Sequence, residues 1–199
     1  MKKLTSICVY CGSGQGNDPA FEQAAFHLGK TMADEGLRLV YGGGNTGLMG
    51  TVARAVIDHG GKVTGIIPEF LKDREVMLKE ADDMIVVPDM HTRKQLMFDR
   101  ADAFVALPGG VGTLEELVEQ LTWSQLGQHT KPILIADIKG FWKPLLSLFE
   151  HMRDTRFIRD RFNVNYLVAD TSEDILPMLM ASTRHHVPEE GDRTITEKL

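Results

Sequence analysis

Residues 103–113 read Ala103-Phe104-Val105-Ala106-Leu107-Pro108-Gly109-Gly110-Val111-Gly112-Thr113, an apolar run that passes directly into a glycine-rich turn. The apolar part does not alternate with polar residues, and the run at 133–135 has the same character. Such runs are typical of strands that helices cover on both faces, and hence of a parallel sheet. The stretch therefore predicts a strand, a tight turn and a following helix within an α/β protein.

Short β-rich runs alternate with amphipathic helical stretches along almost the whole chain. This order favours a single-domain, Rossmann-like doubly wound parallel sheet with helices on both faces. We expect strands at residues 6–10, 37–41, 62–67, 84–87, 103–107, 132–136 and 166–168, and helices at about 19–35, 47–58, 90–99, 113–126, 142–152 and 174–183.

Length and composition fit one globular unit. The chain has 199 residues, of which 43% are hydrophobic and 25% are charged. This is enough for one well-buried core and too apolar for a disordered chain. No internal repeat or low-complexity linker divides the sequence. We expect a nucleotide-binding domain over residues 1–184 and a polar, aperiodic tail over residues 185–199.

Charge and hydropathy argue against nucleic-acid and membrane partners. The 22 Lys and Arg against 28 Asp and Glu give a formal charge of -6, whose field does not attract DNA. No apolar run approaches the roughly 18–20 residues that cross a bilayer. The short apolar stretch behind the basic start is explained better by a strand than by a secretory leader. Because only two cysteines are present, we expect a reducing, cytoplasmic location.

The two cysteines, Cys8 and Cys11, have the spacing of a redox or zinc pair. Residues three apart on a strand point to opposite faces, whereas a redox pair normally opens a helix. No second Cys or His pair follows at the spacing of a zinc site, and none of the seven histidines forms H-E-x-x-H. We therefore expect no metal and no redox role.

Glycine-rich turns follow three of the expected strands. In doubly wound sheets ligands bind at this edge, where turns lead into helix N-termini. Glycine lets backbone N–H groups approach an anion, and the helix N-terminus adds free donors and partial positive charge. Glycines at strand ends are also ordinary turn formers, but three such turns on one edge favour a phosphate site. The residues expected to contact ligand from these turns are Gly12 and Ser13, Gly43 and Gly44, and Gly109, Gly110 and Gly112.

The expected ligand is a mononucleotide or a sugar phosphate. A dinucleotide fingerprint requires G-x-G-x-x-G after the first strand and an acid at the end of the second. The first turn here is G-x-G-x-G, and glycines 42–44 stand where the acid is needed. The G-x-x-x-x-G-K-[ST] pattern of a P-loop is also absent from the sequence.

Glu116 has two interpretations. With Thr113 it forms T-x-x-E, a capping box that satisfies free N–H groups at a helix start. Alternatively, it lies one turn into a helix whose N-terminus binds phosphate, and so lies close to substrate. The apolar stripe of this helix is expected to face the core, which would leave Glu115 and Glu116 toward the cleft rim or solvent. That stripe consists of Leu114, Leu117, Val118 and Leu121.

A basic pair, Arg93 and Lys94, begins the helix after the fourth expected strand. Such a pair is usually a solvated face, but near a helix N-terminus it opposes the helix dipole. An anionic ligand would compensate through the guanidinium fork and the ammonium point charge. Upstream, Arg74 and Glu75 lie in a connection that is long enough to fold over the cleft.

Together these motifs resemble the Lonely Guy (LOG) family of cytokinin-activating proteins, once labelled lysine decarboxylase-like. Its P-G-G-x-G-T-x-x-E signature is matched at residues 108–116, and the resemblance extends from about residue 7 to residue 170. Two departures are Gly14, where many members have Ser, and Val111, where Tyr is frequent; the second leaves the base preference open. The other landmarks are Cys11-Gly12-Ser13, Tyr41-Gly42-Gly43-Gly44-Asn45, Gly47-Leu48-Met49-Gly50 and Met90-His91-Thr92-Arg93-Lys94.

The resemblance implies hydrolysis of the N-glycosidic bond of AMP or N6-substituted adenosine 5′-monophosphates to free base and ribose 5-phosphate, without cofactor or metal. It also implies a homodimer or a dimer-based oligomer. By the same resemblance Arg93 and Glu116 would be catalytic. Contacts to the nucleotide would come from Glu75, Arg93, Lys94, Gly110, Val111, Gly112, Thr113, Leu114, Glu115, Glu116 and Thr122.

This reaction suits a carboxylate. Breaking the C1′–N9 bond builds positive charge on the ribose, which Glu116 can stabilise while it orients or deprotonates water. Arg93, which does not readily give up a proton, would orient phosphate or ribose. Two alternatives stay open: a pyridoxal-phosphate decarboxylase, which needs a lysine Schiff base, and a non-catalytic nucleotide-binding module of the same fold.

Overall fold

The computed structural model describes residues 4–72, 78, 80–158 and 165–185. Seven strands form one sheet in the order β4-β3-β2-β1-β5-β6-β7, and every neighbouring pair is parallel. The expected α/β class is confirmed, and each strand lies within one residue of its predicted bounds. The strands are β1 (Ser6–Tyr10), β2 (Arg38–Tyr41), β3 (Val63–Pro68), β4 (Asp83–Val87), β5 (Ala103–Ala106), β6 (Ile133–Ala136) and β7 (Leu167–Ala169).

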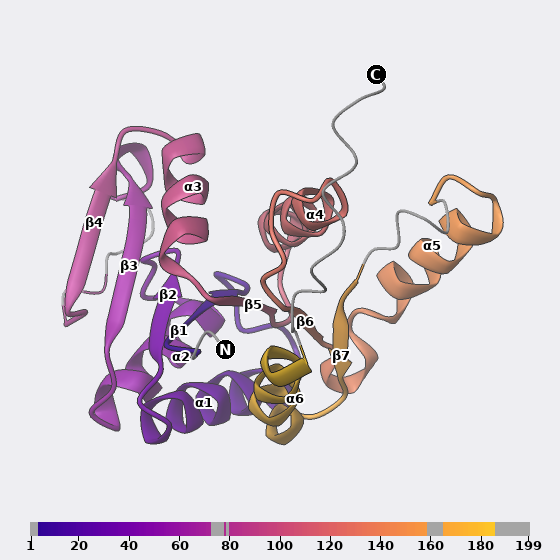
Figure 1. Ribbon diagram of the computed structural model, residues 1–199. Helices are drawn as coiled ribbons and strands as arrows, with labels where there is room; N and C mark the ends of the chain where they lie inside the picture. Colours follow the sequence, from indigo (N-terminus) through magenta and orange to yellow (C-terminus); the bar gives the residue numbers. More distant parts are fainter. Residues whose placement is uncertain (1–3, 73–77, 79, 159–164, 186–199) are drawn as a thin grey trace.

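Helices cover both faces of the sheet, as predicted (Figure 1). Two short 3₁₀ turns, η1 (Glu69–Leu71) and η2 (Ile138–Gly140), follow β3 and β6. The helices on one face are α1 (Pro19–Asp34), α2 (Gly47–Asp58) and α6 (Ser172–His185), and those on the other are α3 (Met90–Arg100), α4 (Val111–Gln125) and α5 (Lys143–Asp154).

The first strand shows how side chains divide between the two faces. Ile7 and Val9 of β1 join the apolar cluster with α1, α2 and α6, whereas Cys8 and Tyr10 join the cluster with α3, α4 and α5. Burial of each such aliphatic side chain stabilises the fold by about 1.5–3 kcal/mol. Cys11 lies on the side of Ile7, so the predicted separation of the two cysteines is confirmed. Both are free, and burial raises the pKa of each thiol.

The order of the sheet reverses between β1 and β5. The connection after β1 leads to α1 on one face, and the connection after β5 leads to α4 on the other. A crevice therefore forms at the carboxyl ends of these two strands. The two connections touch there, because the Gly12 N–H donates to the Pro108 carbonyl at 3.1 Å. The first and third glycine-rich turns thus lie side by side.

Helix α4 begins two residues before its predicted start. Its N-cap residue is Gly110, which makes no side-chain cap bond, and Thr113 lies within the first turn. The predicted capping box of Thr113 and Glu116 is therefore wrong. The helix can begin at Val111 because the preceding glycine adopts the extended cap conformation.

The buried face of α4 also differs from the predicted apolar stripe. Leu117 and Leu121 are buried as expected, but Val118 is 39% exposed. Glu116, expected toward the rim or solvent, is only 8% exposed, and Gln120 is buried beside it. The prediction failed because the buried face of α4 also carries polar residues, which point toward the cavity and the sheet. The spacing of apolar residues therefore does not locate the buried face of this helix.

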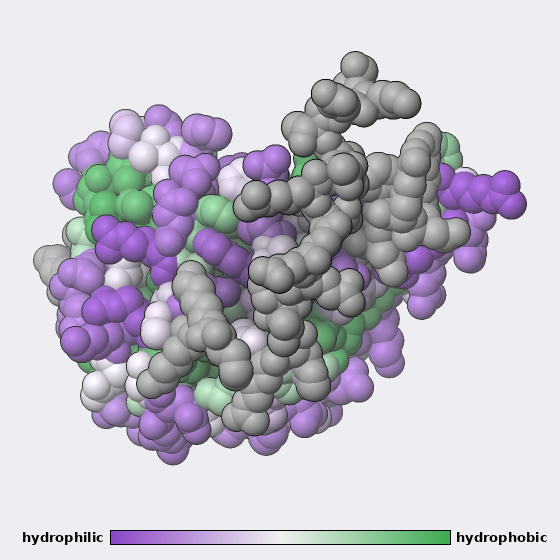
Figure 2. All heavy atoms as spheres, viewed as in Figure 1, coloured by the Kyte–Doolittle hydropathy of each residue, from purple (hydrophilic) through white to green (hydrophobic). Residues whose placement is uncertain are grey.

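The described surface is largely polar. In the view of Figure 2, hydrophilic residues cover most of the described surface, and hydrophobic residues gather in patches, one of them near the edge strand β4. Within the described ranges, no helix combines the length and apolar character that a bilayer span requires. Helix α6 runs to His185, and the rest of the expected tail, residues 186–199, lies outside the described part of the chain.

Candidate active site

A cavity of about 270 Å³ lies at the carboxyl ends of β1 and β5. It is formed by the turn after β1, the first turns of α2 and α3, and the N-terminal turns of α4. Residues from four separate segments therefore meet at the point where the sheet order reverses. Its lining residues are Cys11, Gly12, Ser13, Met49, Met90, Arg93, Gly110, Val111, Gly112, Thr113, Glu115 and Glu116.

The N-terminus of α4 supplies backbone donors to this cavity. The first intrahelical bond runs from the Leu114 N–H to the Gly110 carbonyl at 3.0 Å. The N–H groups of Val111, Gly112 and Thr113 precede that bond and have no intrahelical acceptor. They carry the positive end of the helix dipole, so this turn is suited to a phosphate.

Gly109 brings the first and third glycine-rich turns together. A Cβ at this position would collide with the Thr113 side chain and would lie 2.8 Å from the Gly12 backbone nitrogen. Only glycine allows this close approach. Gly109 itself lines a neighbouring cavity of about 440 Å³, which shares Gly12, Ser13 and Gly110 with the first.

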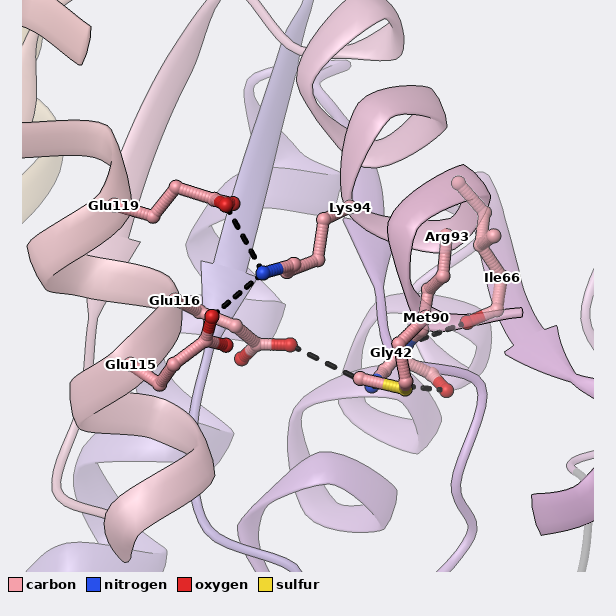
Figure 3. Close-up of polar contacts among 8 residues, drawn as sticks. All are labelled: Gly42, Ile66, Met90, Arg93, Lys94, Glu115, Glu116 and Glu119. Atoms are coloured by element: carbon pink, nitrogen blue, oxygen red, sulfur yellow. Dashed lines mark hydrogen bonds and ion pairs between the residues drawn. The ribbon is translucent and has the colours of Figure 1, made fainter.

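Arg93 is buried against the ends of two strands (Figure 3). Its Nε donates to the Ile66 carbonyl at 3.1 Å and its Nη2 to the Gly42 carbonyl at 3.4 Å. A Cβ at Gly42 would collide with the guanidinium. Carbonyls of β3 and of the turn after β2 thus fix the side chain before any ligand binds.

Glu116 faces Arg93 across the cavity (Figure 3). The Arg93 Nη1 lies 3.6 Å from the Glu116 Oε1, and the two side chains are 9% and 10% exposed. A buried charge requires a partner of this kind. The predicted catalytic pair is therefore brought together, and its carboxylate lies about one turn beyond the N–H donors of α4.

Lys94 extends from α3 toward Glu115 and Glu119 on α4 (Figure 3) and is not among the residues that line the cavity. Its Nζ lies 2.5 Å from Glu115 Oε1 and 2.9 Å from Glu119 Oε1. Burial disfavours the charged amine, but the two ion pairs outweigh that effect and raise the pKa of Lys94. The charge that was expected to require an anionic ligand is therefore compensated by carboxylates of the protein.

The second glycine-rich turn packs closely against neighbouring strands. Gly43, with φ +83°, packs against Ile67 and Met84, and neither Gly43 nor Gly44 lines either cavity. The α2 N–H groups of Leu48 and Met49 donate to the carbonyls of Gly14 and Gly12, both at 3.3 Å. This helix N-terminus thus holds the first turn in place, and the ligand contacts of Gly43 and Gly44 stay a prediction.

Three further predicted contacts fall elsewhere. Leu114 packs against the core beneath α4, and its N–H is already bonded. Thr122 is exposed and donates its hydroxyl to the Val118 carbonyl at 2.7 Å, outside both cavities. Glu75 lies outside the described residues. The cavity does bring together Gly12, Ser13, Arg93, Gly110, Val111, Gly112, Thr113, Glu115 and Glu116.

Sequence reasoning missed several residues that build the site. Gly42 was noted only as one of three glycines, although its carbonyl and its missing side chain both position Arg93. The run 42–44 was the available signal. Ile66 contributes a backbone carbonyl, which has no signature in a sequence, and Glu119, which pairs with Lys94, was not singled out.

The fold and the site define an α/β protein of the doubly wound, nucleotide-binding class. A buried Arg–Glu pair adjoins two glycine-rich turns at the point where the sheet order reverses.

Comparisons with known proteins identify the family. The family model described as "Possible lysine decarboxylase" matches residues 49–179. A cytokinin riboside 5′-monophosphate phosphoribohydrolase, LOG, of Oryza sativa subsp. japonica is 44% identical over 187 residues, covering 94% of this chain and 76% of the rice protein. A cytokinin riboside 5′-monophosphate phosphoribohydrolase of Arabidopsis thaliana, LOG2, is 41% identical over 190 residues, covering 96% of this chain and 87% of the Arabidopsis protein. The chain belongs to this LOG family.

Solved structures show the same fold. A molybdenum cofactor binding protein of Rippkaea orientalis matches with TM-score 0.69 and 23% identity, covering 92% of this chain and 99% of the other. The Moco carrier protein of Chlamydomonas reinhardtii matches with TM-score 0.68 and 20% identity, covering 90% and 99%. At this identity the likeness concerns the fold alone.

Proposed function

We propose that this chain hydrolyses the N-glycosidic bond of AMP or N6-substituted adenosine 5′-monophosphates, releasing free base and ribose 5-phosphate. The observation that carries the proposal is the buried Arg93–Glu116 pair, 3.6 Å apart, beside the free N–H groups at the start of α4. The relatives named as cytokinin riboside 5′-monophosphate phosphoribohydrolases support the same chemistry.

The start of α4 binds the 5′-phosphate in this proposal. The N–H groups of Val111, Gly112 and Thr113 donate to the charged phosphate oxygens, and the glycines on either side of Val111 leave open space around these N–H groups. Holding the phosphate fixes the ribose beside Glu116 and lowers the entropic barrier to attack by water.

Glu116 acts on the ribose and on the water. As the C1′–N9 bond lengthens, the sugar gains oxocarbenium character, which the carboxylate stabilises. Glu116 also orients the water, whose oxygen bonds to C1′ while its proton finally resides on the departing purine. Arg93 keeps the carboxylate in place, because its own position is fixed by the Ile66 and Gly42 carbonyls.

The decarboxylase reaction is a poorer fit. A Schiff base needs a neutral amine as nucleophile, and Lys94 is paired with two carboxylates that raise its pKa. Lys94 is therefore not arranged for the Schiff-base chemistry that the name lysine decarboxylase describes.

The chemistry is tested by Glu116→Gln. We expect the variant to lower kcat for base release from AMP by at least about a hundredfold, because it loses the carboxylate that acts in the transition state. Its Kd for AMP should stay within about threefold of the wild-type value, since the cradle is intact. Product chromatography and calorimetry measure the two quantities, with N6-isopentenyl-AMP as parallel substrate.

Glu150→Gln on α5 is the matched control, because Glu150 is exposed and far from the cavity lining. Normal turnover by Glu116→Gln would refute the mechanism. Binding of AMP without base release by the wild-type protein would instead favour a non-catalytic nucleotide-binding module.

We further propose a homodimer that includes the outer face of α4, and a cytoplasmic location without nucleic-acid partners. Val118 of α4 and Leu126, the C-cap residue of that helix, are 39% and 66% exposed, and a second copy seated on this face would bury both apolar side chains. The two free, buried cysteines and the formal charge of -6 agree with the location and with the absence of nucleic acid.

A further inference from the structure

The sulfur of Met90 and the carboxylate of Glu116 share one nitrogen of Arg93 (Figure 3). The Arg93 Nη1 lies 3.7 Å from the Met90 sulfur and 3.6 Å from the Glu116 Oε1. Met90 is the first residue of α3 and directly follows the N-cap residue Asp89, so its backbone is fixed at the start of that helix. A change in how strongly this sulfur accepts a hydrogen bond therefore acts on the Arg93–Glu116 pair.

As a thioether, Met90 competes weakly for the guanidinium. A thioether sulfur is a weak acceptor, whereas an ionised carboxylate is a strong one. The Nε and Nη2 of Arg93 are bonded to the carbonyls of Ile66 and Gly42. The competition between Met90 and Glu116 is therefore decided at Nη1, and in this form of the side chain it favours Glu116.

The Met90 side chain can be reached from the cavity. In the described part of the chain, two methionines line the cavity, Met49 and Met90. Met49 is only 7% exposed, whereas Met90 is half-buried. A small oxidant that enters the cavity therefore meets Met90 more readily than Met49.

The cysteine in the cavity wall competes poorly for such an oxidant. Cys11 also lines the cavity, but it is 6% exposed. Burial raises the pKa of its thiol, and the charge of Glu116 raises it further. Because the thiolate is the reactive form of a cysteine, Cys11 is unreactive at neutral pH. A thioether does not need to lose a proton before it is oxidised, so Met90 is the reactive sulfur of the cavity.

We propose that Met90 is an oxidation site, at which hydrogen peroxide converts the thioether to a sulfoxide and thereby weakens the Arg93–Glu116 pair. A sulfur lone pair attacks one peroxide oxygen, and an S–O bond forms as the O–O bond breaks. The departing hydroxide takes the proton left on the sulfur-bound oxygen and becomes water. Sulfur is thus oxidised and the peroxide is reduced. The loss of activity rests on the proposed hydrolase function, whereas the oxidation itself does not.

The sulfoxide changes the competition at Nη1. Its oxygen is a strong acceptor on a side chain that has become polar, and it lies next to the guanidinium. When Nη1 donates to this oxygen, Glu116 loses the contact that orients its carboxylate toward the ribose. Methionine sulfoxide is a reducible product, because sulfoxide reductases return it to the thioether. The inactivation is therefore reversible in its chemistry.

The first experiment treats the full-length wild-type protein with hydrogen peroxide and follows peptide masses and kcat for base release from AMP. We expect kcat to fall at least about tenfold as Met90 gains one oxygen, because the pair is misaligned. Met90→Leu, which has no sulfur at this position, should keep its own kcat within about twofold after the same treatment. Met178→Leu on α6 is the matched control, because Met178 is half-buried and lies outside both cavities. This variant should lose kcat as the wild-type protein does.

A second experiment needs no oxidant. Met90→Gln places a strong neutral acceptor on a side chain of similar length, whereas Met90→Leu places none. We expect kcat of Met90→Gln to be at least about fivefold below that of Met90→Leu, because only the glutamine competes for Nη1 of Arg93.

Three results would overturn the inference. The first is an unmodified Met90 after peroxide has oxidised Met178. The second is a loss of kcat in peroxide-treated Met90→Leu equal to that of the wild-type protein. The third is an equal kcat of Met90→Gln and Met90→Leu. A wild-type protein that releases no base from AMP overturns the proposed function instead, and the mass of the Met90 peptide then still tests the oxidation site.

Discussion

Arg93 is the residue on which the site geometry depends most. Each nitrogen of its guanidinium has a protein partner: the carbonyl of Ile66, the carbonyl of Gly42, and Glu116 with the Met90 sulfur. Removing any one of these partners would leave a buried charge partly uncompensated and strongly destabilise the fold. Arg93 therefore depends on all of them. A side chain fixed in this way supplies a constant field and a support for Glu116, and it need not move when substrate binds.

The fixed position of Arg93 gives a prediction for Gly42→Ala. The backbone of Gly42 is not in the left-handed region, so the added methyl acts through its collision with the guanidinium and a tight contact with the Met49 sulfur at 3.3 Å. We expect a stability loss of about 1–3 kcal/mol from overpacking. We expect kcat to fall about a hundredfold, since a displacement near 1 Å misaligns the catalytic pair. Urea unfolding and base-release kinetics measure the two effects.

Gly14→Ala is the comparison variant, because a Cβ at Gly14 meets nothing within 4 Å. If Gly42→Ala and Gly14→Ala turn over equally fast, the absence of a side chain at residue 42 does not position Arg93 for catalysis.

Motifs led to Arg93 and Glu116, but not to the atoms that position them. Gly42 and Arg93 are 51 residues apart, and Lys94 is 21 and 25 residues from its two carboxylates. A sequence indicates that a charge needs compensation, but not whether a ligand or a distant helix provides it. From the sequence we therefore expected an anionic ligand to compensate the charge of Lys94, whereas in the structure Glu115 and Glu119 do so.

At the scale of the element, α4 combines three tasks in one helix. Its start offers backbone donors, its buried face carries Thr113, Glu116 and Gln120, and its outer face exposes Val118. Hydrophobic periodicity locates a helix well but marks its inner face only when that face is apolar. The existence of α4 could thus be predicted, whereas its orientation about its own axis could not.

The end of α4 is held by His129, which gives a pH prediction. Its Nε2 donates to the Gln120 carbonyl at 3.2 Å, and its Nδ1 accepts from the Lys131 N–H at 3.1 Å. This arrangement requires the neutral ring. Burial, together with the positive charge of Lys131, lowers the pKa of His129 below 6.5.

Because the unfolded chain binds this proton more readily, the stabilising effect of His129 is complete above pH 6.5 and is lost as the pH falls toward the lower folded pKa. We expect the free energy of unfolding to decrease between about pH 7 and pH 5, and to decrease less in His129→Gln. Urea titrations at several pH values measure both slopes. Equal slopes would show that His129 titrates alike in the folded and unfolded chains.

At the scale of the whole molecule, the sequence predicted the class of the sheet but not which turns would meet. Continuous apolar runs located the strands, because burial on both faces leaves few polar positions. The strand order decides that the turns after β1 and β5 are neighbours. That order depends on long-range contacts among helices and strands, for which local sequence carries no signal.

The exposed face of α4 leads to a prediction about assembly. We expect the wild-type protein to have twice the chain mass of 22.2 kDa in light scattering at micromolar concentration. Val118→Glu should shift the mass toward one chain, because a charge is costly to bury in an interface core. Leu148→Glu, at a 45% exposed apolar position on α5, is the control and should leave the mass unchanged. A wild-type mass of one chain contradicts the dimer, and a mass unaffected by Val118→Glu places the interface away from this face of α4.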